Sequence, residues 1–183
     1  LFLLINSLFM WVFNGNMNLL DGGYATMETL FFIAPWVFLM LIPAITMRSF
    51  ADEKRTGTLD LLLTRPLSEI QIIFAKYAAA LVLVLLALLP TLVYYISIVY
   101  LGNPTGNLDK GATWGSYLGL IFLAAAYASI GIFSSSLTDN LIIAFLLTAF
   151  LCLTICYGFE QTGTLLSDDP AGSLFVYFGM IEH

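Results

Sequence analysis

The sequence predicts an all-α polytopic membrane protein, a bundle of helices that cross a lipid bilayer. Of its 183 residues, 60% are apolar and 10% are charged, whereas soluble chains are roughly 45–50% apolar. Four long stretches contain no Asp, Glu, Lys, Arg or His, namely 30–47, 77–101, 114–133 and 141–159. A spanning helix needs about 20 mostly apolar residues, whereas barrel strands alternate in polarity. These stretches do not alternate, so helices are predicted.

The composition also excludes several classes of protein. The chain is too apolar to be a water-soluble globular enzyme, and its composition is unlike that of a disordered protein. The net charge of −6 excludes a nucleic-acid-binding protein.

The first apolar run, 1–13, predicts only the remnant of a helix. At about 1.5 Å per residue it reaches about two-thirds of a roughly 30 Å hydrocarbon core. The chain begins without Met, and the closing apolar run at 173–181 is also too short to span. We therefore expect a single transmembrane domain, 1–183, with missing sequence on both sides.

Four complete membrane helices are expected after this remnant. Following a polar loop at 14–25, Thr26 is predicted to cap the second helix, which runs to about Met47. The polar segment 48–67 follows. Ser68 with Gln71 three residues later forms a capping box, so the third helix starts there and continues to about Leu101.

The fourth and fifth helices follow a turn-rich loop at 102–112. Thr113 is predicted to cap the fourth helix, 134–138 to link it to the fifth, and 160–169 to form an acidic loop. Ser173–Ile181 is a further short apolar piece.

Basic residues predict the orientation. Five of the six lie in the connection between the second and third helices, which should therefore be cytoplasmic. The loops at 14–27, 102–113 and 160–183 then face outward. The five basic residues of the connection are Arg48, Lys54, Arg55, Arg65 and Lys76. The sixth, Lys110, lies in an outward-facing loop and is the one exception.

Catalysis is not predicted. The single histidine, His183, cannot build a metal cluster or a histidine relay with other histidines. Cys152 and Cys156 lie one turn apart, which is compatible with a redox or metal pair, but two small apolar side chains in a packed helix are favoured. The absence of ionisable residues in the apolar runs also disfavours ion-coupled transport.

Prolines and small residues give further candidates. Pro35, Pro43 and Pro90 lie inside predicted helices and are candidate hinges, or simply prolines of the kind that membrane helices tolerate. Gly111, Gly115 and Gly119 recur every four residues and predict close helix packing, within the chain in preference to between subunits. Five scattered polar residues are expected to bond to neighbouring helices: Asn6, Ser97, Ser129, Thr148 and Thr154.

The connection at 48–69 is the most informative segment. It combines mixed charges, a break at Gly57, and leucines at Leu59, Leu62 and Leu63. Thr58 can cap and Pro66 can end a short amphipathic helix at the cytoplasmic face. Such a helix can anchor at the membrane surface or insert into a groove on a soluble partner.

This segment resembles a known family. Phe-Ala-Asp-Glu-Lys-Arg-Thr-Gly-Thr-Leu-Asp-Leu-Leu-Leu-Thr-Arg-Pro-Leu-Ser, followed by Ile-Ile-Phe-Ala-Lys-Tyr, is similar to the signature of type 2 ABC-transporter permeases. Asp60 stands where relatives often have Glu. Further stretches resemble the gliding-motility-associated permease subunits of Bacteroidota, namely Ala34–Trp36, Leu41–Phe50 and Gly119–Phe133.

The resemblance implies six membrane helices per subunit, two permease subunits and two cytoplasmic ATP-binding subunits, which would bind ATP and Mg; this chain would hold no cofactor. It makes the connection, around 52–66, a coupling helix seated on the ATPase. It also implies an outer helical element at 170–183, an accessory membrane protein, and a bacterial inner-membrane location. The residues implied in ATPase binding are Glu53, Lys54, Arg55, Thr58, Leu59, Leu62 and Leu63.

Two other functions stay open. A secondary transporter or channel would work without a nucleotide-binding partner, and a non-transporting anchor of a motility or secretion complex would have no substrate path between paired subunits. The transported substrate is not predicted by the sequence, because its membrane helices contain no charged pocket.

Overall fold

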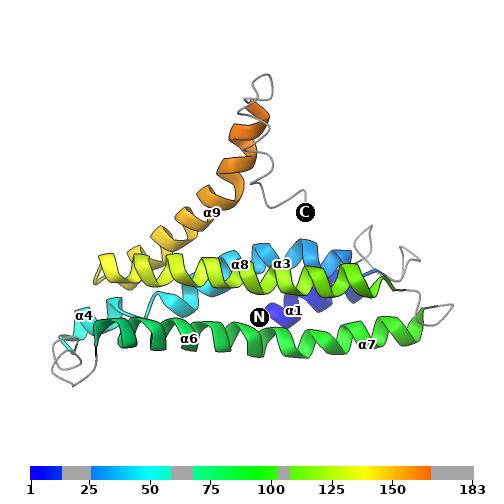
Figure 1. Ribbon diagram of the computed structural model, residues 1–183, viewed down its shortest axis with the longest axis horizontal. Helices are drawn as coiled ribbons and strands as arrows, with labels where there is room; N and C mark the ends of the chain where they lie inside the picture. Colours follow the sequence, from blue (N-terminus) through cyan, green and yellow to red (C-terminus); the bar gives the residue numbers. More distant parts are fainter. Residues whose placement is uncertain (14–25, 59–67, 103–107, 166–183) are drawn as a thin grey trace.

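The computed structural model describes residues 1–13, 26–58, 68–102 and 108–165, with side chains given as far as Cys156 (Figure 1). The described ranges contain helices and no strands. The helices are α1 (Phe2–Ser7), α3 (Glu28–Thr46), α4 (Ala51–Thr56), α6 (Glu69–Leu88), α7 (Leu92–Leu101), α8 (Lys110–Leu137) and α9 (Leu141–Leu165). A π-helical turn, Leu8–Val12, follows α1, and a 3-10 turn, Leu89–Thr91, joins α6 to α7.

The predicted all-α membrane bundle is confirmed. Three helical stretches of the described chain are long and apolar enough to cross a membrane: Glu28–Thr56, Glu69–Leu101 and Lys110–Leu137. The apolar runs form helices because hydrocarbon offers no hydrogen-bond partner to the backbone, and a helix satisfies its own N–H and C=O groups.

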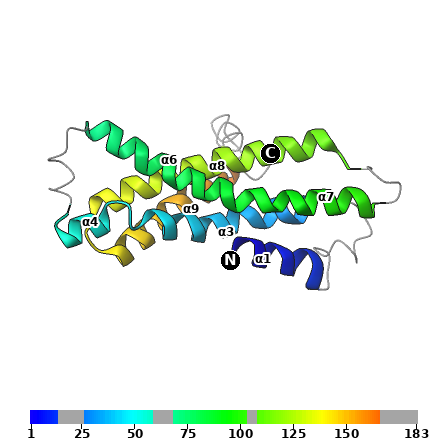
Figure 2. The same cartoon turned by 90° about the horizontal axis from the view of Figure 1, so that it is seen from below.

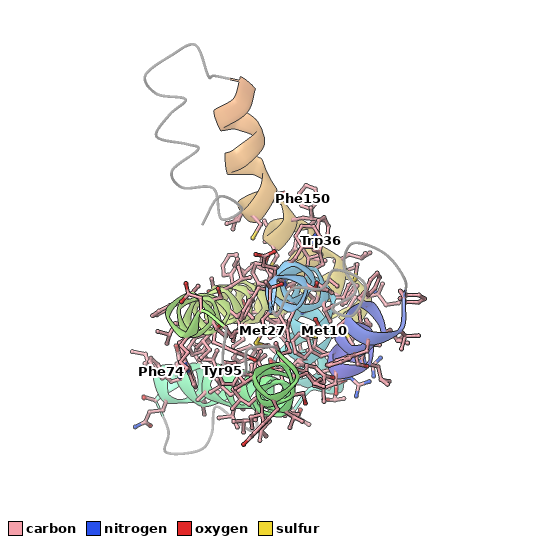
Figure 3. All side chains as sticks on the ribbon, turned by 90° about the vertical axis from the view of Figure 1, so that its right-hand side faces the viewer. Met10, Met27, Trp36, Phe74, Tyr95 and Phe150 are labelled. Atoms are coloured by element: carbon pink, nitrogen blue, oxygen red, sulfur yellow. The ribbon has the colours of Figure 1, made fainter. Side chains whose placement is uncertain are left out.

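The helices α3 and α8 pack against each other, with α6 against α8 and α1 against α3. The α3, α6–α7 and α8 stretches run along the long axis of the molecule (Figures 1 and 2). The helix α9 packs on α8 and α3 at its start and then projects steeply away from the bundle (Figure 1). Met10 and Met27 point into the interior, whereas Trp36 and Phe150 lie on the side where α9 leaves (Figure 3).

The helices α3 and α8 approach each other closely at Gly131. A Cβ atom added there would clash with Thr46 Oγ1 and would lie 2.8 Å from Thr46 Cβ, a separation that real Cβ atoms essentially never show. Ala124 and Ala128, two turns and one turn earlier on α8, are 1% and 0% exposed. Small residues thus let the two backbones approach closely, as in other membrane bundles.

The start of α9 packs through a second set of small residues. Ala144, Thr148, Cys152 and Cys156 recur every four residues, and all four are buried. Both cysteines are free thiols, and Cys156 Sγ lies 2.7 Å from the hydroxyl of Tyr127 on α8. Their burial on a packed face supports the interpretation of the two cysteines as packing residues.

The helix starts test the predicted caps. The capping box is confirmed, because Ser68 Oγ accepts from Gln71 N–H at 3.4 Å and Gln71 Oε1 accepts from Ser68 N–H at 3.1 Å. The Thr113 cap is wrong, because α8 begins three residues earlier, at Lys110. Asp109 caps it, with Oδ1 accepting from the N–H groups of Gly111 and Ala112. The Thr26 cap is also wrong, since α3 begins at Glu28 without a side-chain cap.

The connections are shorter than predicted. Residues 134–137 belong to α8, so the link to α9 is 138–140, and residues 160–165 continue α9 where an acidic loop was expected. Residues 110–113 are likewise helical and not loop. The predicted outer element at 170–183 lies outside the described residues.

The five scattered polar side chains bond to their own helices, which corrects the expectation of bonds between helices. Ser97, Ser129, Thr148 and Thr154 each donate to a carbonyl three or four residues earlier. Asn6 Nδ2 donates to Phe2 O in the same way, at 2.9 Å. The preceding turn is the nearest acceptor for a short side chain in an apolar helix.

The candidate hinge prolines differ in their surroundings. The helix α3 continues through Pro35 and Pro43. Pro90 interrupts the α-helical pattern, and the 3-10 turn around it separates α6 from α7. Thr91 Oγ1 donates to Leu88 O at 2.6 Å and lies 3.0 Å from the Tyr117 hydroxyl of α8, which ties the break to the neighbouring helix. Hinge motion at these prolines stays a prediction.

The predicted glycine stripe does not pack within the described chain. A Cβ added at Gly115 or Gly119 would meet nothing within 4 Å, and one at Gly111 would meet only Asp109 Oδ1, at 3.4 Å. The expected intrachain packing at Gly115 and Gly119 is therefore wrong for the described residues. The close contact of α8 lies at Gly131, on another face of the helix.

This difference between the glycines is testable. Gly131→Ala should destabilise the folded protein in detergent by about 1–3 kcal/mol, because the added methyl overpacks the α3–α8 contact. Gly119→Ala is the matched control in the same helix, and we expect it to change stability by less than about 0.5 kcal/mol under monomeric conditions. Thermal unfolding measures both, and equal stability of the two variants would contradict the close approach at Gly131.

Candidate functional site

The turn between α3 and α4 is held by a serine from a third helix. The backbone leaves α3 after Thr46 and enters α4 at Ala51, so terminal N–H and C=O groups lack partners within their helices. Phe50 occupies the N-cap position of α4 and has no side-chain acceptor. The acceptor at the start of α4 is Ser135 Oγ on α8, which accepts from the N–H groups of Phe50 and Ala51 at 3.0 Å each.

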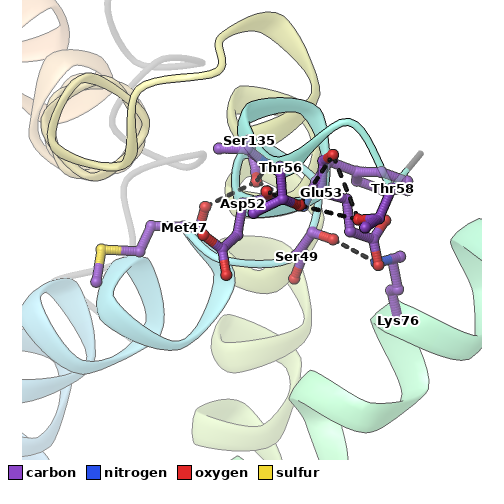
Figure 4. Close-up of polar contacts among 10 residues, drawn as sticks. Met47, Ser49, Asp52, Glu53, Thr56, Thr58, Lys76 and Ser135 are labelled. Atoms are coloured by element: carbon purple, nitrogen blue, oxygen red, sulfur yellow. Dashed lines mark hydrogen bonds and ion pairs between the residues drawn. The ribbon is translucent and has the colours of Figure 1, made fainter. Parts of the chain in front are cut away.

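The same hydroxyl also serves the end of α3. Ser135 Oγ donates to Met47 O at 3.0 Å (Figure 4). Ser135 is fully buried. One side chain on α8 therefore satisfies polar backbone groups at the end of α3 and at the start of α4, and fixes the turn between them.

The helix α4 is short, and its charges follow the helix dipole. Asp52 and Glu53 lie in its first turn, and Lys54 and Arg55 in its last. Gly57 ends it in the left-handed conformation, with φ of 69°. Its N–H donates to Lys54 O at 3.2 Å and that of Thr58 to Glu53 O at 3.0 Å, which is the Schellman arrangement. The break predicted at Gly57 is confirmed.

An ion pair joins α4 to α6. Lys76 Nζ lies 2.5 Å from Glu53 Oε1 and also donates to Ser49 O (Figure 4). The two side chains are 18% and 28% exposed. The other carboxylate oxygen, Glu53 Oε2, is buried without a hydrogen-bond partner among the described residues. A charged pair shielded in this way is screened less by salt than a surface pair.

A small apolar cluster lies under this ion pair. Phe50, Ile72 of α6 and Ile132 of α8 are each less than 10% exposed and pack together, with Tyr77 against them. The ammonium of Lys76 lies 4.7 Å from the centre of the Phe50 ring, within range of a cation–π interaction. The turn residue Phe50 is thus fixed by both its backbone and its ring.

The remaining charges of α4 differ in their surroundings. Lys54 donates to Ser136 O at the C-terminal end of α8, where the helix dipole favours a cation. Arg55 pairs with Asp52 at 3.5 Å, but these side chains are 62% and 44% exposed. That pair is a surface contact of small energetic value.

The residues implied in ATPase binding therefore divide into three groups. Glu53 and Lys54 contact α6 and α8, so they hold α4 in place. Arg55 and Thr58 are exposed. Leu59, Leu62 and Leu63, with the amphipathic helix predicted for them, lie outside the described residues.

Sequence reasoning missed the serine. Ser135 was assigned to a link between helices, although Ser134-Ser-Ser136 at a helix end offers hydroxyls that can reach a neighbouring turn. The residue pattern also placed a short helix after Gly57, with Thr58 as its cap, and missed the helix that the charged stretch forms before it. Only the resemblance extended a helix back to about residue 52. The signal was present, since two acidic residues, two basic residues and a glycine follow in the order that a short helix favours.

Within the part of the chain that the structure describes, no group of three or more His, Cys, Asp or Glu residues could hold a metal ion. The turn and the short helix α4 are bound by hydrogen bonds and an ion pair to α6 and α8.

A family model described as ABC-2 family transporter protein matches residues 9–168. The chain belongs to the ABC-2 transporter family. It is a permease subunit and a multi-pass membrane protein, from a family that serves as a generally non-catalytic membrane component of transport. Membership implies a cytoplasmic ATP-binding partner in general. No curated protein and no solved structure matches the chain.

In this ABC-2 permease the two ion pairs of α4 should differ in strength. A double-mutant cycle with Glu53→Gln and Lys76→Met should give a coupling energy of about 1–2 kcal/mol, because the pair is mostly buried. The cycle with Asp52→Asn and Arg55→Met should give less than about 0.5 kcal/mol, because that pair is solvated.

Amide hydrogen exchange of α4 measures both cycles as free energies of local opening. Coupling of equal size in the two cycles would mean that Lys76 does not hold α4 on α6.

Proposed function

We propose that this permease subunit works in an ABC exporter, and that its connection 48–69 is the coupling segment on which the cytoplasmic ATPase sits. One observation carries the proposal. The short helix α4 is bound where the ends of α3, α6 and α8 meet, so a force applied to it reaches three long helices at once.

The charges favour a cytoplasmic position for this end of the bundle. Arg48, Lys54, Arg55 and Lys76 belong to the connection or to the first turns of α6, whereas Lys110 begins α8 at its other end. Basic residues accumulate on the cytoplasmic side of membrane proteins. We therefore assign the protein to the bacterial inner membrane, with the connections around 14–27, 103–109 and beyond 165 in the periplasm.

The proposed mechanism keeps nucleotide chemistry outside this chain. ATP and Mg would be bound by the partner ATPase, and closure of the ATPase dimer would move the coupling segment and tilt the helices to which it is joined. Glu53 and Lys54 would hold the segment on the bundle, Arg55 and Thr58 would present polar groups, and Leu59, Leu62 and Leu63 would be the apolar anchors in the ATPase.

A second copy of this permease is a proposed partner. Gly115 and Gly119 lie on an open face of α8, beside Trp114, Leu118 and Phe122, which are all more than half exposed. Small residues flanked by large apolar ones allow close contact between membrane helices. This supports the subunit contact that the sequence left open for the glycine stripe, with lipid covering the remaining apolar surface.

The resemblance to gliding-motility permeases supports a narrower proposal, in which the exporter serves motility or protein secretion and associates with an accessory membrane protein. A non-transporting anchor of such a complex, or a secondary transporter, would not need the ATPase contact. Permease-stimulated, vanadate-sensitive ATP turnover therefore separates the exporter from both alternatives.

Replacing Leu59, Leu62 and Leu63 together by Asp should abolish binding of the ATPase subunit, because charged side chains cannot enter an apolar groove. Pull-down of the ATPase with the membrane-inserted variant measures the loss, which we expect to exceed about 100-fold in affinity. The control is Asn140→Asp, which adds a charge at the same end of the bundle in an exposed connection. Retained binding by a folded triple variant would contradict the proposal.

The orientation gives a second test. In a background lacking Cys152 and Cys156, we expect Lys110→Cys to react with an impermeant maleimide in right-side-out membrane vesicles. Thr58→Cys should react only after the vesicles are opened. Both positions are exposed, so labelling reports the side of the membrane and not burial. Labelling of Thr58→Cys from outside would exclude a cytoplasmic coupling segment.

A further inference from the structure

The coupling segment is joined more directly to α8 than its place in the chain suggests. By sequence it connects α3 to α6, so motion would be expected to pass into those two helices. In the structure, Ser135 and Ser136 at the end of α8 bond to Phe50, Ala51 and Lys54. These contacts join residues more than 80 positions apart in the chain.

The three long stretches also differ in stiffness. The helix α3 contains Pro35 and Pro43, and the α6–α7 stretch is interrupted at Pro90. The helix α8 has no proline and runs unbroken for 28 residues, about 42 Å at 1.5 Å per residue. Because prolines are common places where helices bend, α8 lacks bending sites of this kind that the other two stretches contain.

The position of α8 in the bundle adds to this effect. It packs against α3, α6 and α9, whereas the contact between α3 and α6 is small. The Gly131–Thr46 approach places α8 in close contact with α3. A displacement of α8 would therefore be passed on to each helix around it.

We propose that Ser135, supported by the Glu53–Lys76 pair, is a positioning residue that makes α8 the main lever between the coupling segment and the membrane helices. The proposal rests on the proposed function as an ABC permease subunit. The hydroxyl of Ser135 holds the start of α4 and the end of α3 on α8. Without it the turn loses three hydrogen bonds to α8 at once. The bond from Lys54 to Ser136 O then remains, and α4 is coupled to α8 more loosely.

Ser135→Ala tests the proposal, and Ser134→Ala is a matched control. Both serines are fully buried, but Ser134 Oγ donates only within its own helix, to Ile130 O at 2.9 Å. The permease and its ATPase subunit are assembled in lipid nanodiscs, with a fluorophore on Lys110→Cys at the far end of α8 in the background without Cys152 and Cys156. The signal is the fluorescence change on adding ATP, Mg and vanadate.

We expect Ser134→Ala to keep the wild-type signal. Ser135→Ala should bind the ATPase with an affinity within about threefold of wild type, but the rate of the ATP-dependent change should fall about tenfold, within the usual range of coupling between distant sites. Amide exchange of α4 should accelerate in Ser135→Ala alone. A variant that is merely less stable would lose the signal and ATPase binding together.

A second pair of variants covers the case in which Ser135→Ala does not fold. Glu53→Gln weakens the support from α6 and should also slow the signal, whereas Asp52→Asn alters a neighbouring surface pair and should not. Suppose that wild type binds the ATPase and that the ATP-dependent fluorescence change is as fast in Ser135→Ala as in Ser134→Ala. The proposed role of Ser135 is then wrong, and the permease function stands. If the fluorescence change is as fast in Glu53→Gln as in Asp52→Asn, the supporting role of the Glu53–Lys76 ion pair is wrong. If wild type fails to bind the ATPase, the proposed function fails and takes this inference with it.

Discussion

Unsatisfied backbone groups are the constraint on which this structure depends. Hydrocarbon accepts no hydrogen bonds, so each N–H and C=O must find its partner within the protein. Long helices meet the constraint along their length, and the short polar side chains of Ser97, Thr148 and Thr154 meet it by bonding to their own preceding turn. The difficulty remains wherever a helix ends inside the fold.

The turn between α3 and α4 is such a place, and its solution shapes the functional end of the molecule. No side chain of the turn caps α4, so the cap comes from α8 through Ser135. Because the turn lacks its own side-chain acceptor, the hydrogen bonds that complete it connect distant parts of the chain. The same contacts that complete the hydrogen bonding also bind a short charged helix to the membrane bundle.

The packing follows a second rule, that small side chains decide where membrane helices approach. Gly131, Ala124 and Ala128 bring α8 onto α3, and a regular series from Ala144 to Cys156 brings α9 onto both. Large apolar side chains then face outward on the described surface. The open glycines at Gly115 and Gly119 follow the same rule on a face that a single subunit leaves uncovered.

The sequence by itself determined the class of fold and the approximate spans, and it predicts the orientation. Run length and charge distribution suffice for these, because the cost of burying charge in hydrocarbon acts on each segment separately. The Ser68 capping box and the Gly57 break were also predictable, since both depend on neighbouring residues.

Only the tertiary structure decided which glycine packs, where α8 begins and ends, and which residues hold α4. Gly131 and Gly119 look alike in sequence, and the difference between them is set by the presence of Thr46 on a helix far away in the chain. Ser135 likewise gained its role from two backbone N–H groups and a carbonyl more than 80 residues earlier. Such roles depend on how helices are placed in space, and local sequence pattern carries no record of that placement.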